Sequence, residues 1–339
     1  MQRPNPQRPQ SQSRPCPDCS SEASVSRREF VQRTGAAALA AGAFSLTGRL
    51  PGAFAAPTSS SPAETNVQQL FQLLTPEQRK EVCFPFNDER RSRINANWHV
   101  AEHRIQSDFY TPDQKRLIAE IFRGVTSEEG HERFLKQMEY DDGGFEAYSM
   151  AIFGEPGTGK FEWALTGRHL TIRADGDSVE GAAFGGPIIY GHGDEEPEYN
   201  IFYYQTKQAN EVFKALDAPQ AKQALLEKAP QETAVQLQGE SGKFRGLKVS
   251  ELSGDQKELV SNVIRVLLAP YRNEDAEEAM AIMEQGGGLD SLHMAFYKEE
   301  DLNNDQEWDI WRIEGPTFVS HFRGAPHVHA YLNIGTRKA

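Results

Sequence analysis

Short segments with β-strand character occur in runs along this chain, and this distribution constrains the fold more than any other feature. β-branched and aromatic residues recur at period two in residues 148–153, 161–173, 179–184, 201–204, 293–297, 308–314, 318–322 and 328–334. Helix-like segments lie at residues 76–83, 112–123, 127–139, 205–216, 219–228, 254–268 and 274–285. A doubly wound fold requires strict alternation of strands and helices. We therefore expect an α+β fold, with a mostly antiparallel sheet and several flanking helices.

Four of the predicted helix starts carry a capping box, in which Ser or Thr is followed three residues later by Gln or Glu. The pairs are Thr75 with Gln78, Thr111 with Gln114, Thr126 with Glu129, and Ser253 with Gln256. Strands on both sides of residue 240 could complete one sheet. We therefore expect residues 67–339 to form a single α+β domain.

The first 55 residues have the features of a twin-arginine export signal. Arg27 and Arg28 precede an Ala/Gly-rich apolar run at residues 35–46, and an A-x-A cleavage site follows at residues 53–55. An amphipathic helix of the fold is the alternative, but the run lacks polar periodicity. We expect the twin-arginine translocase to be a partner during export and the processed protein to be periplasmic or secreted. Residues 56–66 are polar and predict a flexible linker.

Charge and composition argue against two classes of partner. The chain has 36 Lys and Arg against 49 Asp and Glu, a formal net charge of −13. Seven Arg and three acidic residues leave with the leader, so the remainder carries −17. An acidic surface repels phosphates, and nucleic acid is therefore not an expected partner. No uninterrupted apolar run reaches the roughly 20 residues of a membrane span, so no integral membrane segment is expected after processing.

Two motifs resemble ligand-binding loops but fail at critical positions. Residues 154–160 match the glycines and lysine of a P-loop, yet Phe161 replaces the Mg²⁺-binding Ser or Thr. The sequence then continues as a strand, which favours a hairpin turn. Residues 301–305 resemble the start of an EF-hand loop, but Gln306 replaces the turn glycine. We interpret this segment as a solvated acidic loop, with a weak calcium site as the alternative.

Histidines supply the main candidate site. In residues 326–334 the alternation of a strand places His327, His329, Tyr331 and Asn333 on one face. Neighbours on one face lie roughly 6 to 7 Å apart, so the two imidazoles can converge on one transition-metal ion: zinc, copper or iron. Paired histidines that only hydrogen-bond to each other are the alternative.

Two further histidines are candidate ligands of the same ion. Leu170 and Ile172 occupy the core face of their strand, which directs His169 to the opposite face. His192 is flanked by glycines in a predicted turn, where the backbone can approach a ligand closely. His169 and His192 are therefore predicted as metal ligands together with the pair near the C-terminus, although each alone also fits a structural role.

Seven short motifs are spread over most of the chain after the leader. They are Leu74-Thr75-Pro76-Glu77-Gln78-Arg79, Phe84-Pro85-Phe86, Asn97-Trp98-His99, Phe153-Gly154-Glu155-Pro156, Gly167-Arg168-His169-Leu170, Trp311-Arg312-Ile313-Glu314-Gly315-Pro316 and His327-Val328-His329. With these motifs the chain resembles the family known as domain of unknown function 3500, and residues 184–192 are similar to an exported bacterial branch of it. The resemblance implies that His169, His327 and His329 match histidine-bearing motifs of the family, whereas His192 matches only the branch pattern. It implies no settled activity.

These features favour an exported protein with a histidine-rich transition-metal site. Three neutral imidazoles leave a coordination position open for water or substrate, which suits a metal-dependent oxidoreductase or hydrolase acting on a small organic substrate. Glu162 and Glu314 are candidate bases by their strand positions. A non-catalytic metal- or ligand-binding protein of the envelope is the alternative from another functional class, and a structural domain whose histidines only hydrogen-bond is a third.

Overall fold

One sheet joins the two halves of the chain in the computed structural model, which describes residues 56–336. Its strands are, in sheet order, β1 (Cys83–Phe84), β2 (Ser149–Gly154), β3 (Phe161–Gly167), β4 (Leu170–Ala174), β5 (Ile188–His192), β11 (Val328–Ile334), β10 (Phe318–Arg323), β9 (Ile310–Glu314), β8 (His293–Tyr297) and β6 (Leu225–Leu226), with β7 (Leu247–Lys248) beside β8. Among the described strands only β1 with β2 and β6 with β8 pair in parallel. The predicted α+β class with a mostly antiparallel sheet is confirmed.

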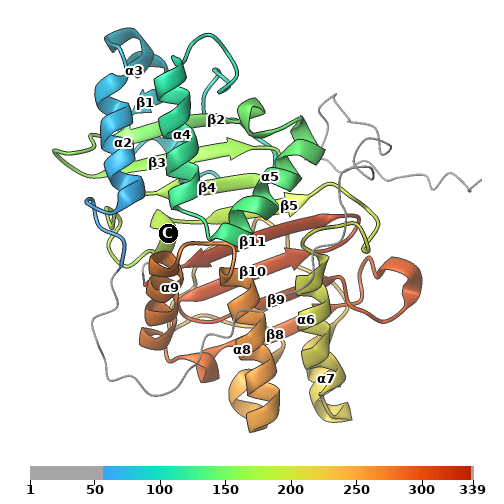
Figure 1. Ribbon diagram of the computed structural model, residues 1–339. Helices are drawn as coiled ribbons and strands as arrows, with labels where there is room; N and C mark the ends of the chain where they lie inside the picture. The colour runs from blue at the N-terminus through green and yellow to red at the C-terminus, as the bar shows by residue number, and fades with distance from the viewer. Residues whose placement is uncertain (1–55, 337–339) are drawn as a thin grey trace, which may run out of the picture.

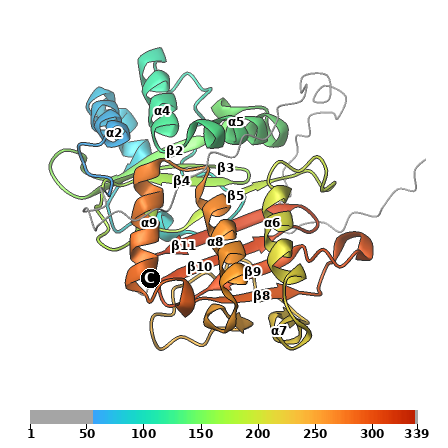
Figure 2. The ribbon, with the colours of Figure 1, turned by 60° about the horizontal axis from the view of Figure 1, so that its bottom comes forward.

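Helices cover one face of this sheet. Within residues 56–336 they are α2 (Pro62–Leu73), α3 (Pro76–Val82), α4 (Pro112–Gly124), α5 (Glu128–Asp142), α6 (Tyr203–Lys214), α7 (Ala218–Ala224), α8 (Gly254–Leu268) and α9 (Asn273–Gln285). Figure 1 shows α2, α4 and α5 in front of the N-terminal strands, with α6, α8 and α9 in front of the C-terminal ones. Figure 2 shows the latter three helices across β8 to β11. The main hydrophobic core lies between this helix layer and the sheet.

Long non-helical segments cover the other face of the sheet. Trp98, in the segment that leads from β1 to α4, packs there against Ala151 and Ala164. Val235 belongs to residues 227–246, which we call the covering segment, and it packs with Tyr331 of β11. Side chains on this second face are therefore shielded by coil rather than by helices.

Most of the predicted strands are present, with three differences. Residues 179–184 and 201–204 are not strands, because the first ends in a 3₁₀ turn at Ala183–Gly185 and the second runs into α6. A turn divides the long segment at 161–173 into β3 and β4. β5 is a strand where a turn around His192 was expected.

The predicted helix starts are correct in three of four cases. Both hydrogen bonds of the capping box form at Thr75, Thr111 and Ser253. The box predicted at Thr126 is wrong, because Ser127 is the N-cap of α5 and its hydroxyl accepts the Gly130 N–H at 2.9 Å. The helix predicted over 219–228 is shorter, because it ends at Ala224 and β6 begins at Leu225.

The flexible linker predicted for residues 56–66 is wrong from Pro62 onward, because α2 begins there. Glu64 is fully buried and accepts two hydrogen bonds from the Arg272 guanidinium, at 2.9 and 2.6 Å. Arg272 Nε also donates to Asp275 at 2.9 Å. Buried charges require such partners, since leaving water is costly for them. The folded part therefore begins before residue 67, while the export signal predicted for residues 1–55 lies outside the described residues.

The P-loop-like segment is a hairpin turn, as predicted. β2 and β3 pair antiparallel with Gly154 opposite Phe161, and the Glu155 N–H donates to the Lys160 carbonyl at 3.1 Å. Gly154 has φ +78°, a left-handed conformation that glycine adopts without strain. The acidic segment at residues 301–305 lies in a loop with a short 3₁₀ turn at Leu302–Asn304.

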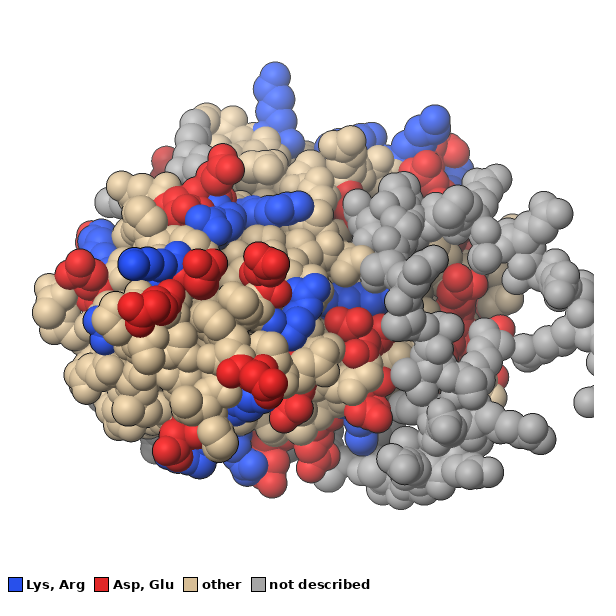
Figure 3. All heavy atoms as spheres, turned by 90° about the horizontal axis from the view of Figure 1, so that it is seen from above, with Lys and Arg blue, Asp and Glu red and all other residues tan. Residues whose placement is uncertain are grey.

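The surface mixes both signs of charge on the side of the molecule that lies at the top of Figure 1. Figure 3 shows Lys and Arg interspersed with Asp and Glu there, so the net charge of −13 is not concentrated in one patch on this face. None of the helices in residues 56–336 is both long enough and apolar enough to cross a membrane.

Candidate metal centre

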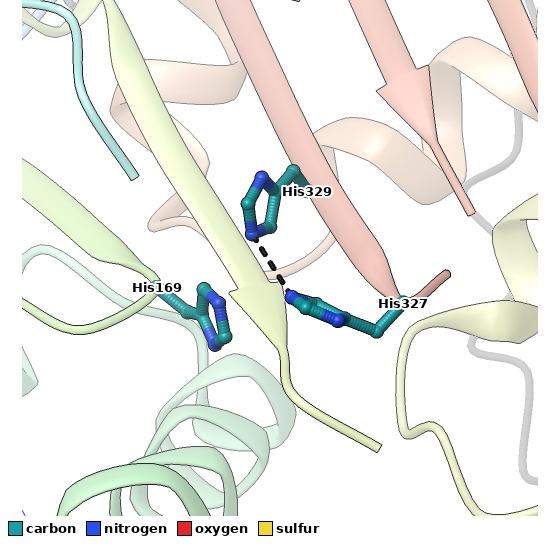
Figure 4. A group of neighbouring side chains, drawn as sticks. All are labelled: His169, His327 and His329. Carbon is teal, nitrogen blue, oxygen red and sulfur yellow. Dashed lines mark hydrogen bonds between the residues drawn. The ribbon is translucent and has the colours of Figure 1, made fainter. Parts of the chain in front are cut away.

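Three of the four predicted histidines meet on the face of the sheet that the non-helical segments cover (Figure 4). His327 immediately precedes β11, His329 lies within it, and His169 immediately precedes β4. One ligand atom from each residue lies within 4.8 Å of those of the other two, and the Nε2 atoms of His327 and His329 are 3.2 Å apart. His169 and His329 are 0% exposed and His327 is 5% exposed. The three imidazoles therefore form a compact group that is almost closed to solvent.

Alternation along β11 gives the strand two different faces. Val328, Ala330 and Leu332 pack into the core beneath the helices. His329 lies on the opposite face, where it is paired with Arg323 of β10 and with Gly191 of β5. The strand predicted from the sequence thus presents its histidines as expected, on the face away from the helices.

Gly191 allows His169 to reach His329 across β5. This strand lies between β4 and β11, and Figure 4 shows it passing between the two imidazoles. Leu170 pairs with Tyr190, so the antiparallel register places His169 opposite Gly191. A Cβ at residue 191 would lie 2.2 Å from the Val328 carbonyl oxygen and 3.4 Å from the His169 Cβ. Glycine therefore leaves open the space that the imidazoles share.

His169 occupies a tight turn with an unusual backbone conformation. Arg168 and His169 form the two-residue connection between β3 and β4, and His169 has φ +59°, which non-glycine residues rarely adopt. The His169 N–H donates to the Ala96 carbonyl at 2.6 Å. The Arg168 carbonyl accepts from Tyr148 Oη at 2.5 Å and from Gln137 Nε2 at 3.0 Å. Such backbone strain persists where surrounding contacts fix it, and it is concentrated at functional sites.

Carboxylates behind two of the imidazoles determine which ring nitrogen carries hydrogen. Asp141 Oδ2, in the last turn of α5, lies 2.8 Å from His169 Nδ1. The two carboxylate oxygens of Glu232, in the covering segment, lie 3.2 and 3.3 Å from His329 Nδ1. An ionised carboxylate can only accept, so Nδ1 donates in both histidines and Nε2 carries the lone pair. A carboxylate behind a ligating histidine is the usual support of a metal site. Neither Asp141 nor Glu232 was predicted from the sequence.

Glu232 also fastens the covering segment to the sheet around His329. Tyr331 Oη donates to Glu232 Oε1 at 2.8 Å, and Arg323 Nε lies 3.1 Å from Glu232 Oε2. Arg323 is the cross-strand partner of His329, and Tyr331 is its neighbour on the same face of β11. One carboxylate thus joins three side chains of the sheet and holds the segment over the site.

Electrostatics keep the two histidines near the C-terminus neutral. Burial holds the pKa of His329 well below its ordinary value, and the charge of Arg323 and the imidazole of His169 act in the same direction. Burial, then the imidazoles of His329 and His169, likewise lower the pKa of His327. Burial alone would raise the pKa of Asp141, but attraction to His169 and their hydrogen bond hold it well below its usual range. The site therefore combines the neutral imidazoles of His327 and His329 with an ionised carboxylate at Asp141.

The spacing of the ring nitrogens fits a tetrahedral ion. Two nitrogens bound at 2.0 to 2.1 Å in tetrahedral geometry lie about 3.3 Å apart. The Nε2 atoms of His327 and His329 are 3.2 Å apart, so this pair already has the required separation. The third ligand atom, within 4.8 Å of both, needs to approach by only about 1.5 Å to complete the set. Without an ion, the same pair is explained by a hydrogen bond from His327 Nε2 to the lone pair on His329 Nε2.

The structure does not bring His192 into this group. His192 shares one face of β5 with Ile188 and Tyr190, which pack beneath the helices, and its ring lies 4.6 Å from that of Tyr140 in α5. Its Nδ1 accepts the Ile201 N–H at 3.3 Å, and its buried Nε2 has no hydrogen-bond partner among residues 56–336. Alternation therefore points His192 to the helix side of β5, whereas Gly191 faces the three histidines.

The two glutamates considered as bases are engaged in salt bridges elsewhere on the sheet. Glu162 Oε2 lies 3.0 Å from Arg91 Nη1, and Glu162 Oε1 is also paired with the Arg173 guanidinium. Glu314 Oε2 accepts from Arg312 Nε at 2.9 Å. Neither belongs to the cluster of candidate ligands found within residues 56–336.

Comparison with known proteins gives one match. The family model described as "Protein of unknown function (DUF3500)" matches residues 57–333, a span that contains the three clustered histidines, Asp141 and Glu232. No curated protein matches the chain, and neither does any solved structure. The resemblance seen in the sequence motifs is therefore confirmed for the family, while the exported branch remains a prediction.

Proposed function

The chain belongs to the DUF3500 family, and we propose that this member binds one transition-metal ion through His169, His327 and His329. Zinc is the ion that the donor set supports best, since three neutral imidazoles without sulfur ligands form a known zinc environment that leaves the fourth position to water. Copper and iron are the next candidates, because imidazole also suits them. Export through the twin-arginine route to the periplasm or beyond completes the proposal and is supported by Arg27 and Arg28.

The observation that carries this proposal is the pair of carboxylates behind the ligands. Asp141 and Glu232 each accept from an Nδ1 atom, at 2.8 and 3.2 Å, and so direct the Nε2 lone pairs of His169 and His329 into the cluster. A group of histidines that only filled space would need no such orientation.

The reaction class that fits is metal-assisted hydrolysis or hydration of a small organic substrate. Zinc held by the three imidazoles would keep one position open for water, and by lowering the pKa of that water to about 7 it would supply hydroxide at neutral pH. Glu232, held by Arg323 and Tyr331, would fix the His329 imidazole in the orientation that the ion requires. With copper or iron in the same ligands the class would be oxidation instead.

One observation favours a second function, a non-catalytic metal-binding protein of the envelope. The three imidazoles are at most 5% exposed, and the covering segment lies over them. A catalytic ion must be reached by substrate, whereas a stored or structural ion need not be. The two functions differ in whether a small external ligand can reach the bound ion.

The experiment that tests metal binding is elemental analysis of the full chain, purified through its own export route without chelators. We expect close to one equivalent of metal per chain, and strong loss in His169→Ala, His327→Ala and His329→Ala. His131→Ala is the matched control, because His131 lies on α5 outside the cluster and should retain the ion. A metal-free wild type that takes up no zinc, copper or iron on titration would refute the proposal.

A ligand-access measurement then separates the two functions. Cobalt replaces zinc as a coloured probe, and azide is added while the visible spectrum is recorded. A spectral change with ester hydrolysis supports the enzyme, whereas an unchanged spectrum with no turnover supports the binding protein.

Export is tested separately from both functions. The double variant Arg27→Lys with Arg28→Lys should retain the protein in the cytoplasm, since Lys lacks the planar guanidinium. Unchanged secretion of this variant would refute the export part of the proposal.

A further inference from the structure

A second polar site lies on the same face of the sheet, at a distance of two strands from the histidines. A cavity of about 290 Å³ is lined by side chains of β8 and β9 and by residues of the covering segment. Arg312 of β9 is paired with His321 of β10, which is paired in turn with Tyr331 of β11. The volume is at the low end of the ~300 to 1,000 Å³ range of small-molecule sites.

Arg312 lines this cavity and has one buried donor without an acceptor among residues 56–336. Its Nε and Nη2 donate to Glu314 at 2.9 and 3.1 Å, and Nη2 also donates to the Ala234 carbonyl at 2.7 Å. Nη1 has no hydrogen-bond partner among residues 56–336, although Arg312 is only 6% exposed. A buried charged donor without an acceptor is costly, and a guanidinium cannot lose its proton to avoid the cost. The structure thus contains an oriented, charged N–H group that lacks an acceptor.

The other side chains around Arg312 extend this positive character. Lys243 and Arg245 also line the cavity, and neither forms an ion pair with any residue in the described part of the chain. The lining therefore carries three cations against the single carboxylate of Glu314, in a chain whose net charge is −13. Tyr297 adds a phenol: burial raises its pKa, and the nearby charges of Arg312 and Arg245 oppose this without reversing it, so the hydroxyl remains a donor.

We propose that this cavity binds a small organic anion, whose carboxylate or phosphate oxygens accept from Arg312 Nη1 and from the side chains of Lys243 and Arg245. Glu314 holds the far edge of the Arg312 guanidinium, so Nη1 keeps a fixed direction. Ala234 and the ring of Tyr297 provide an apolar wall for the carbon skeleton. The rigid buried arginine supplies orientation, and the two exposed cations supply attraction that weakens as salt is added. The site is independent of the metal centre and shares no residue with it.

Binding is measured by isothermal titration of the full chain, with inorganic phosphate in one arm and succinate in the other. The two arms distinguish a phosphate ligand from a carboxylate ligand, and tighter binding in either one supports the site. The double variant Lys243→Gln with Arg245→Gln should weaken binding about tenfold, because two charged partners are lost. Lys248→Gln removes an exposed Lys charge that does not line the cavity, and it should change affinity less than about twofold.

Two further measurements keep the inference distinct from folding effects and from the metal. Arg312→Lys keeps the positive charge but removes the planar guanidinium, and its binding is compared with that of the wild type only if its thermal melt remains cooperative. Lys243 and Arg245 are exposed, so their variants should fold normally. His169→Ala should bind the probe as well as the wild type does, even when no metal is retained. Failure of the wild type to bind either probe at millimolar concentration in low salt would overturn the proposal, as would unchanged binding in the double variant.

Discussion

Replacing Asp141 with Asn tests whether the histidine cluster is built for a metal. Three donors reach this carboxylate: the Gly193 N–H at 2.9 Å on Oδ1, and Gln137 Nε2 and His169 Nδ1, each at 2.8 Å, on Oδ2. Asn has almost the same shape but only one acceptor oxygen. One side of its carboxamide must therefore direct an NH₂ group toward a donor.

Either orientation of the Asn side chain has a cost. If the oxygen stays on Gly193, the NH₂ group faces His169 Nδ1 and favours the tautomer with hydrogen on Nε2, which cannot ligate. If the oxygen turns to His169, the Gly193 N–H loses its acceptor, at about 1 to 3 kcal/mol of stability. Losing a carboxylate behind a ligand typically lowers metal affinity 10- to 100-fold, which is about 1.4 to 2.7 kcal/mol.

Competition with a chromophoric chelator measures this affinity directly, and thermal melting of the metal-free proteins measures stability separately. Asp142→Asn is the control, because Asp142 is the next residue of α5 and is partly exposed. We expect Asp141→Asn to lose at least tenfold in zinc affinity and Asp142→Asn to lose little. Equal affinities in wild type and Asp141→Asn would refute the idea that this carboxylate orients a ligand.

Three other expectations follow from single positions. Gly191→Ala should abolish metal binding, since its Cβ would lie 2.2 Å from a carbonyl oxygen, whereas Gly159→Ala meets no atom within 4 Å and should leave metal content unchanged. Lys160→Ala should change the urea-derived stability by less than about 1 kcal/mol, and the wild type should show no ATP binding in equilibrium dialysis, because Lys160 lies in an exposed hairpin turn. Burial raises the pKa of Asp309 to about 7, so the folded state keeps a proton that the unfolded state releases near pH 4, and stability should fall as pH rises from about 4 to 7. Urea midpoints at pH 5 and 8 should therefore converge in Asp309→Asn, and parallel shifts in both proteins would contradict this.

Two members of the histidine cluster were predictable because strand alternation is a local property. His327 and His329 are two residues apart on β11, so the period of the strand places both on one face without any knowledge of the fold. His169 was predicted by the same alternation, but it lies in the β3–β4 turn with φ +59°, so its direction depends on that turn and not on the period of a strand. His192 differs because its segment was interpreted as a turn. The segment is in fact strand β5, in which alternation places Gly191 on the face of the histidine cluster and His192 on the face that the helices cover.

The supporting carboxylates were not predictable, since their role depends on long-range contacts. Asp141 is 28 residues from His169 and Glu232 is 97 residues from His329. Asp141 lies in an acidic helix end, where several carboxylates have the same local sequence context, and only packing selects one of them. α2 was missed for another reason: Ser61 makes no side-chain cap, and the preceding polar residues resemble a linker. The spacing of Ala63, Val67 and Leu70, all fully buried, was the signal that could have found it.

Burial of the site governs how an ion enters and leaves it. His169, His327 and His329 are at most 5% exposed, and Glu232 holds the covering segment down by contacts to Arg323, His329 and Tyr331. An ion can then exchange only when these contacts open, so the rate of metal removal should depend on opening and not on chelator concentration. If the protein is exported folded by the proposed twin-arginine route, the covering segment would be closed over the ion during export, and the ion would be kept for the same reason. The contacts of Glu232 that orient His329 are therefore also the contacts that would set the rate of metal exchange. Both the affinity for the ion and its rate of release would then depend on the Glu232 side chain.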